Sequence, residues 1–143
     1  MTIEHNKVLI RRRAELMNQH DVDGALSFLS PTYRDHSAPP PGLPSGIEGE
    51  RQFFAMLFNA FPDLKVTVED LIAEEDRVVE RLTLQGTHKG VFMGAPPSGA
   101  RATWGFINIY RIVDDKVVEV WSEGDHLGLM QQIGLIPPPQ PVR

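Results

Sequence analysis

The sequence contains no cysteine, no long apolar run and no excess of basic residues, and each absence excludes a class of protein. None of its 143 residues is Cys, so disulfides, thiolate nucleophiles and Cys-ligated metal or iron–sulfur centres are excluded. Lys and Arg number 14 against 19 Asp and Glu, a formal net charge of -5, which argues against binding to a nucleic-acid backbone. No apolar run approaches the ~20 residues that span a bilayer, and the polar N-terminus is unlike a signal peptide. We therefore expect a cytoplasmic protein that binds neither nucleic acid nor membrane.

The length predicts one domain with one hydrophobic core. A chain of ~150 residues buries about two-thirds of the surface that it exposes when unfolded. We expect a single domain over residues 1–136, followed by a flexible proline-rich tail over residues 137–143.

Two helices are predicted at the start of the chain. Apolar residues recur at helical spacing over residues 3–17. The only basic cluster, Arg11 to Arg13, lies within this pattern and is interpreted as a solvated helix face. A short second helix is expected after a cap at Asp21 or Asp23, and Pro31 ends it.

A stiff loop and a third helix are predicted next. The segment 37–46 cannot continue a helix or a central strand because it contains four prolines, Pro39, Pro40, Pro41 and Pro44. A loop between ordered elements in this position is expected to form a wall or lid of a cavity. Ser45 and Glu48 have the spacing of a capping box, which predicts a helix that continues to residue 61.

From residue 64 onward, alternating apolar and polar residues predict strands joined by tight turns. The turn at Asp114 and Asp115 predicts a hairpin of the last two strands, and a final short helix is expected to stop at Gly134. Helices followed by antiparallel strands make the α+β pattern, with the helices on one face of a curved sheet. The expected strands cover residues 64–69, 77–85, 100–112 and 116–122.

Asp125 is the first candidate for chemistry. It follows Trp121 and Glu123 in strand alternation, so the three side chains would share one face if the strand continues. A carboxylate beside aromatic surface is desolvated, and its raised pKa suits a general acid or base near neutral pH. The alternative is structural, because Asp125 also stands where an N-cap of the last helix would stand.

Two histidines and a set of strand residues complete the candidate site. His36 and His88 could exchange protons near neutral pH, although lone histidines are commonly structural. No spacing typical of metal ligands links them to Asp125, and no metal or cofactor is predicted. Arg81 lies in the middle of a predicted strand among apolar residues, and we expect its charge to be paired with Glu123 or Asp125. Glu80 and Glu119 are expected to be solvated. The substrate-binding set is Tyr33, Arg81, Trp104, Phe106, Tyr110, Trp121 and Glu123, although an aromatic stripe at strand spacing is also typical of a core.

Three segments resemble the SnoaL-like polyketide cyclases, also called predicted ester cyclases. They are YRDHSAPPPG, FPDLKVTVEDLIAEEDRVVERLTLQGTHKGVFMGAPPSG and WGFINIYRIVDDKVVEVWSEGDHLGLMQQIG. The resemblance implies a nuclear transport factor two-like α+β cone, with a curved antiparallel sheet, three N-terminal helices and one pocket. It also implies assembly through the sheet as a homodimer, which we expect here, or as a higher oligomer. It implies that an aspartate, Asp125 by its place in WSEGD, is the general acid/base of an intramolecular aldol condensation. The pairs Asp35–His36 and Thr87–His88 match family positions that face the pocket.

The leading hypothesis is therefore a cofactor-independent cyclase, or a related lyase or isomerase, that acts on a hydrophobic carbonyl compound. Asp125 would carry the proton, and His36 and His88 would orient the substrate. A non-catalytic small-molecule binding module with the same pocket is the alternative, and a structural dimerisation domain is a third class.

Overall fold

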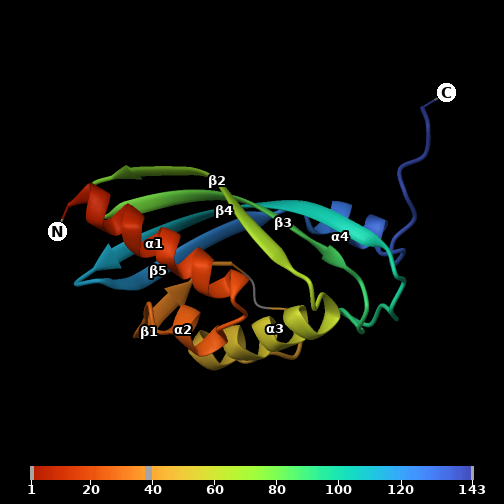
Figure 1. The fold of residues 1–143 in the computed structure, drawn as a ribbon, viewed down its shortest axis with the longest axis horizontal. Coiled ribbons are helices and arrows are strands. Elements are labelled where there is room, and N and C mark those ends of the chain that lie inside the picture. The colour runs from red at the N-terminus through yellow and green to blue at the C-terminus, as the bar shows by residue number, and fades with distance from the viewer. Residues whose placement is uncertain (1, 38–39, 143) are drawn as a thin grey trace.

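The computed structural model describes residues 2–37 and 40–142. The described residues form one five-stranded sheet and four helices (Figure 1). In chain order these are α1 (Ile3–Asn18), α2 (Val22–Leu26), β1 (Leu29–Asp35), α3 (Gly46–Ala60), β2 (Lys65–Glu74), β3 (Arg77–Thr87), β4 (Arg101–Val113), β5 (Lys116–Gly124) and α4 (His126–Gln132).

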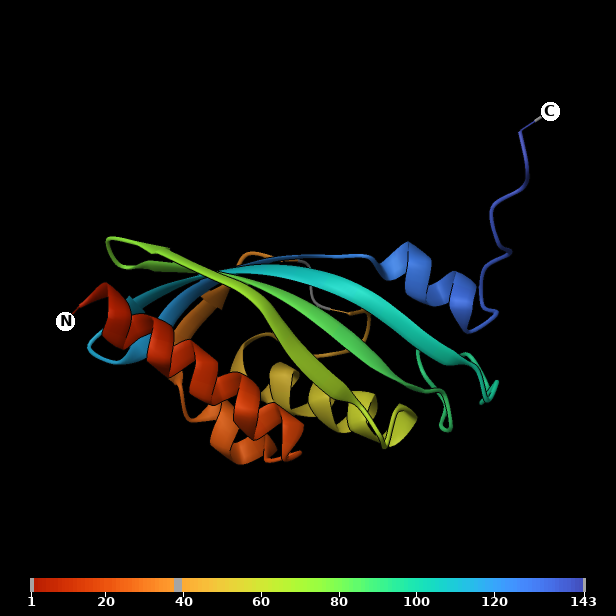
Figure 2. The same cartoon turned by 45° about the horizontal axis from the view of Figure 1, so that its top comes forward.

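The three N-terminal helices lie on one side of the curved sheet, and α4 lies at the far end of the molecule from the N-terminus (Figures 1 and 2). The strand order is β1-β5-β4-β3-β2. We call the sheet surface that faces α1 and α3 the inner face and the opposite surface the outer face. The expected α+β architecture, with a curved sheet against three N-terminal helices, is confirmed.

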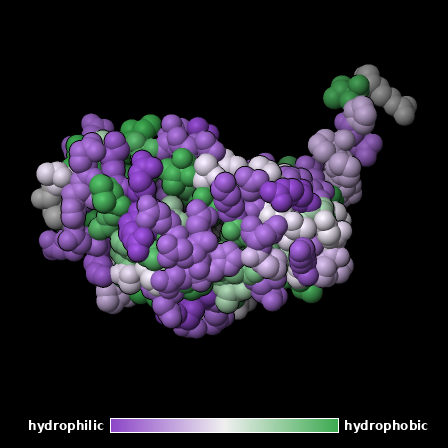
Figure 3. Space-filling model, viewed as in Figure 1, coloured by the Kyte–Doolittle hydropathy of each residue, from purple (hydrophilic) through white to green (hydrophobic). Residues whose placement is uncertain are grey.

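The β4–β5 hairpin forms where the sequence predicts it. Asp114 and Asp115 connect its strands with φ angles of 50° and 62°, and two successive residues with positive φ are typical of a turn that matches the twist of a hairpin. Hydrophilic residues predominate on the surface seen in Figure 3, with hydrophobic residues scattered between them. Within the described segments, no helix is long and apolar enough to cross a membrane.

The first strand differs from the prediction. Residues 29–35 form β1, an edge strand parallel to β5, whereas Leu29 is expected in the second helix and Pro31 as its stop. Proline is accepted in an edge strand because one side of that strand needs no ladder hydrogen bond. The sheet is therefore mixed, and only its other three pairings are antiparallel.

Two details of the helix caps also emerge. Asp21, rather than Asp23, caps α2 by accepting a hydrogen bond from the Gly24 amide at 2.9 Å. Ser45 occupies the N-cap position of α3, but its side chain makes no capping hydrogen bond, so the predicted capping box with Glu48 is wrong. The predicted start of the helix is nevertheless right.

Candidate active site in a cavity of the inner face

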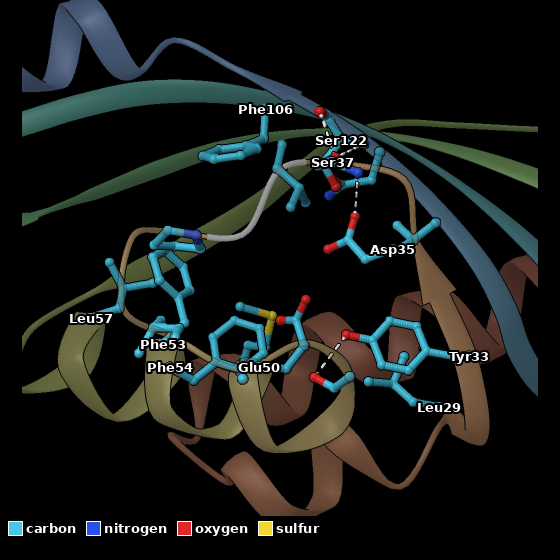
Figure 4. Close-up of a pocket in the computed structure, with 18 of the residues that line it drawn as sticks. Leu29, Tyr33, Asp35, Ser37, Glu50, Phe53, Phe54, Leu57, Phe106 and Ser122 are labelled. Atoms are coloured by element: carbon cyan, nitrogen blue, oxygen red, sulfur yellow. Dashed lines mark hydrogen bonds between the residues drawn. The ribbon is translucent and has the colours of Figure 1, made fainter.

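A cavity of about 550 Å³ lies between the inner face of the sheet, α1, α3 and the loop from β1 to α3 (Figure 4). The expectation that the proline-containing loop forms a cavity wall is confirmed, because Ser37, Pro40, Leu43 and Pro44 line it; Pro39 lies outside the described residues. The aromatic residues of the lining are Tyr33, Phe53, Phe54, Phe92, Trp104, Phe106 and Tyr110.

The aromatic stripe of β4 reaches the cavity because of the strand register. Trp104, Phe106, Asn108 and Tyr110 share one face by alternation, and all four line the cavity. They stand opposite Leu84, Leu82, Glu80 and Val78 of β3. The cavity wall is thus mostly apolar, with polar groups at a few points, as is typical of small-molecule sites.

Two carboxylates meet in this cavity. Glu50 of α3 and Asp35 of β1 both line it and point toward each other, with the Tyr33 hydroxyl close by (Figure 4). Burial raises the pKa of Glu50, and the neighbouring Asp35 charge raises it further, against the lowering effect of Arg13. Burial and the nearby Glu50 raise the pKa of Tyr33 as well. A carboxyl group with a raised pKa in an apolar cavity can hold a proton near neutral pH and transfer it.

The Asp35 carboxylate is positioned by its own loop. It accepts a hydrogen bond from the Ser37 amide at 2.8 Å. The Ser37 hydroxyl in turn donates to the Ser122 carbonyl at 3.1 Å and accepts from the Ser122 amide at 2.9 Å. These contacts bind the end of β1 to β5 and fix the direction in which Asp35 enters the cavity.

A buried network of four polar residues lies under the same cavity. Arg13 donates through Nη1 to the Tyr110 hydroxyl at 3.1 Å, and this hydroxyl donates to Glu80 Oε1 at 2.8 Å. Asn108 donates to the same oxygen at 3.2 Å. Burial raises the pKa of Glu80, while Arg13 and the two hydrogen bonds lower it in part. The network satisfies a carboxylate that is only 1% exposed, as buried polar groups require.

A family model described as SnoaL-like polyketide cyclase matches residues 7–133 of the chain. The chain belongs to this family. The aklanonic acid methyl ester cyclases DnrD of Streptomyces peucetius and DauD of Streptomyces sp. strain C5 are each 31% identical to it over 133 residues, which is 88% of this chain and 88% and 80% of theirs.

Solved structures agree with this membership. AclR of Streptomyces galilaeus, named as a candidate hydroxylase, has a TM-score of 0.87 and 30% identity, with 97% of this chain and 87% of AclR covered. TsrD of Streptomyces laurentii has a TM-score of 0.84 and 32% identity, with 95% and 99% covered. The predicted SnoaL-like, nuclear transport factor two-like fold is confirmed.

In this SnoaL-like protein, Asp125 is the N-cap of α4. Its carboxylate accepts a hydrogen bond from the Gly128 amide at 2.9 Å, its side chain is exposed, and the residue is not among the described lining residues of the cavity. Ser122, three positions earlier on β5, and His126, one position later, both line the cavity. The hydrogen bond from the Gly128 amide is the contact expected of an N-cap, which is the structural alternative for Asp125.

The two predicted histidines also lie away from the cavity lining. His36 stacks on Trp121 of the outer face, with ring centroids 4.6 Å apart, and its Nε2 lies 2.8 Å from Glu119. His88 is fully buried beside Phe61. Asp125, His36 and His88 are thus not brought together.

His88 is hydrogen-bonded to the loop that follows β3. Its Nδ1 lies 2.9 Å from the Ser98 hydroxyl and accepts from the Ser98 amide at 3.2 Å. Nε2 is buried without a partner among the described residues. This histidine belongs to the packing between the end of β3 and the following loop.

The predicted faces of β3 are wrong. Arg81 lies on the outer face, half-exposed, and pairs with Asp70 at 2.6 Å, not with Glu123 or Asp125. Glu80, which we expected in solvent, is buried on the inner face. Strand alternation explains the exchange, because Glu80 shares its face with Val78 and Leu82 while Arg81 does not.

Trp121 and Glu123 lie on the outer face for the same reason. They stand opposite Ile109 and Ile107, and neither is among the described cavity residues. The residues of β5 that line the cavity are Val120 and Ser122.

Sequence reasoning missed Arg13 and Glu50. Arg13 is 7% exposed, so the expectation that it belongs to a solvated face with Arg11 and Arg12 is wrong. Helical spacing contains the signal, because Arg13 is three residues after Ile10 and four before Met17, both buried. Glu50 likewise precedes Phe54 by one turn on the inner side of α3.

Proposed function

We propose that this SnoaL-like protein is a cofactor-independent enzyme of the cyclase type, with Glu50 and Asp35 as its proton-transferring pair. The single observation behind the proposal is that these two carboxyl groups face each other inside an apolar cavity, where burial raises the pKa of Glu50. The substrate class is a hydrophobic carbonyl compound, in line with the ester named for the relatives DnrD and DauD.

The pair can serve both halves of an intramolecular aldol reaction. The Asp35 carboxylate removes a proton from a carbon between two carbonyl groups, and the resulting carbanion attacks a second carbonyl carbon of the same molecule. A new carbon–carbon bond forms, and the neutral Glu50 carboxyl donates its proton to the oxygen of the attacked carbonyl. A later transfer of the proton from Asp35 to Glu50 restores the starting state.

Glu50→Gln is the decisive variant. It keeps the size of the side chain but cannot transfer a proton, so we expect turnover of aklanonic acid methyl ester, or of the best ester in a polyketide-like panel, to fall about 10²–10⁴-fold with binding retained. Glu48→Gln is the matched control, because Glu48 lies one half-turn away on the same helix and is exposed. Asp125→Asn tests the prediction made from the sequence. Full turnover in Glu50→Gln would overturn the proposal, and loss of turnover in Asp125→Asn alone would transfer the role to Asp125.

The pH dependence of stability tests the state of Glu50 independently of turnover. Because the pKa of Glu50 is raised in the folded protein, the contribution of its proton is present below the unfolded pKa and is lost as the pH rises through the folded pKa. Glu50→Gln stays neutral and removes this loss. The Tm of the variant should therefore gain on that of the parent as the pH rises from 4 to 8, and by more than the Tm of the exposed-site control Glu48→Gln.

A binding module is the second candidate, since the cavity alone would hold a ligand. Binding of the ester panel with no turnover by the parent would favour the binding module over the enzyme.

We also propose the homodimer that the resemblance implies, formed through the outer face, where Ile72 and Ile107 are 63% and 47% exposed. Sedimentation of the parent and of Ile107→Lys would test it, with a monomeric parent as the contradicting result.

A further inference from the structure

Asn108 of β4 presents a hydrogen-bond acceptor to the cavity. Its side chain is 8% exposed, lines the cavity and makes one hydrogen bond to a described residue, from Nδ2 to Glu80 Oε1 at 3.2 Å. Its Oδ1 accepts no hydrogen bond from the described residues, and it does not belong to the polar atoms that are buried without a partner. This oxygen is therefore open to the cavity and unpaired.

The network beneath the cavity fixes the orientation of the Asn108 amide. Arg13 can only donate, so the Tyr110 oxygen accepts from Nη1 and the Tyr110 proton points to Glu80 Oε1. Because this carboxylate oxygen is an acceptor, the group of Asn108 that faces it must be the donating NH2. The reverse orientation would place two acceptors in contact in a buried site, where an unmade hydrogen bond is costly. The network thus directs Oδ1 of Asn108 toward the cavity.

A second unpaired polar group stands beside Asn108. Ser122 of β5 is directly opposite it in the strand register, and opposite residues of antiparallel strands have Cβ atoms about 5 Å apart. Ser122 also lines the cavity. Its hydroxyl makes no hydrogen bond to a described residue, because its contacts with Ser37 use the backbone of Ser122. This hydroxyl can both donate and accept.

We propose that Asn108 and Ser122 bind a hydroxyl group of the ligand, so that the preferred substrate is a hydroxylated aromatic carbonyl compound. This inference rests on the proposed function, whose substrate class it narrows. A ligand hydroxyl can donate to Oδ1 of Asn108 and accept from the Ser122 hydroxyl at once. An ether or carbonyl oxygen cannot donate, so it would leave Oδ1 unpaired.

The hydroxyl site and the carboxyl pair lie at different points of the cavity. Ser122 and Phe106 are on the sheet side, and Glu50 is on the α3 side across from them (Figure 4). A ligand whose hydroxyl is bound at the sheet would place its ring against Phe106 and direct the rest of the molecule toward Glu50. The two polar sites together would therefore orient the reacting carbonyl groups.

A matched pair of probes tests the proposal without any turnover. The compounds 2-naphthol and 2-methoxynaphthalene share a flat apolar body, and only the first can donate a hydrogen bond. Trp104 lines the cavity and Trp121 does not, so Trp121→Phe leaves a single fluorescent reporter of cavity binding. In this background we expect 2-naphthol to bind ~10-fold more tightly than the ether, which leaves Oδ1 of Asn108 unpaired.

Asn108→Leu should reduce this preference to within about twofold, because it replaces the amide by an apolar group of similar size. Asn59→Leu is the matched control, since it makes the same change at an exposed position of α3 outside the described cavity lining, and it should keep the preference. Asn108→Val, which suits a strand, is the second variant if Asn108→Leu does not fold.

Three outcomes would overturn the proposal. They are a parent that does not bind 2-naphthol, a parent that binds both probes equally, and a preference that survives the loss of the Asn108 amide. The last outcome would mean that the hydroxyl donates to Asp35 or Glu50 instead.

Turnover separates the failure of this inference from the failure of the proposed function. Glu50→Gln should keep the preference for 2-naphthol while it loses turnover of the ester panel. Retained turnover in Glu50→Gln, with a preference that depends on Asn108, would refute the proposed function alone. Lost turnover in Glu50→Gln, without any preference for 2-naphthol in the parent, would refute the Asn108 inference alone.

Discussion

The inner and outer faces of the same strands use charged residues in opposite ways. On the inner face of β3, Glu80 is 1% exposed and is held by Tyr110 and Asn108. One position along, Arg81 pairs with Asp70 on the outer face, and both side chains are about half exposed. A buried carboxylate depends on its network, whereas an exposed ion pair gains little because water solvates both partners.

The outer face shows the same contrast around Glu119. Its carboxylate accepts hydrogen bonds from His36 and Arg111, which lower its pKa, while burial raises the pKa of Glu80 on the inner face and of Glu50 on α3, across the cavity. The pKa shifts of these three carboxyl groups thus differ in direction between the cavity side and the outer face. The comparison teaches that burial dominates the pKa of the carboxyl groups beside the cavity, whereas charge pairing dominates that of Glu119 on the outer face.

Glu80→Ala should produce the largest difference between the faces. It leaves Arg13 buried without its compensating charge, and we expect a loss of about 3–5 kcal/mol in the free energy of unfolding. Glu69→Ala, at an exposed site on β2, is the control and should change little. Urea unfolding measures the free energy of unfolding of Glu80→Ala and Glu69→Ala. Equal values would contradict the expected difference between the buried and the exposed carboxylate.

Gly124→Ala should have the next largest effect. A Cβ at this position would lie 2.5 Å from Cε1 of Phe106, so the ring must shift, at a cost of about 1–3 kcal/mol. Because Phe106 lines the cavity, we expect the shift to change the shape of the cavity. Gly105→Ala is the control, since its Cβ would meet only the Leu82 carbonyl at 3.7 Å. The Tm and the affinity for the best ester of the polyketide-like panel should both decline for Gly124→Ala, and unchanged ester binding would show that the Phe106 ring moves away from the cavity.

Asp125→Ala should cost about 1 kcal/mol, because the α4 N-cap loses its hydrogen bond to the Gly128 amide. Asp125→Asn keeps an accepting oxygen and should lose much less. The difference in the free energy of unfolding between Asp125→Ala and Asp125→Asn measures the capping hydrogen bond alone. If Asp125→Asn were as destabilising as Asp125→Ala, the lost cap would not be the source of the effect.

Arg81→Ala should have the smallest effect, within about 1 kcal/mol, because its pair with Asp70 is half-exposed. The double variant with Asp70→Ala measures the pair energy by a mutant cycle. A coupling above about 1 kcal/mol would contradict the view that the outer-face pairs contribute little.

Local patterns in the sequence were sufficient for most elements. Helical spacing predicted α1 and α3, alternation predicted four strands, and the two aspartates at 114 and 115 predicted the hairpin. Residues 29–35 were missed as β1 because their strand partner, β5, lies about 90 positions later, and the pairing of distant segments leaves no local signal.

For the candidate site, the sequence by itself determined which residue types were available and that Trp104, Phe106, Asn108 and Tyr110 share a face. Only the tertiary structure decided that Glu50 of α3 meets Asp35 of β1, that Arg13 of α1 reaches Tyr110 of β4, and that Asp125 caps a helix. The reason is physical. Periodicity places a side chain on one face of its own element, whereas burial, charge pairing and pKa depend on which other elements that face contacts.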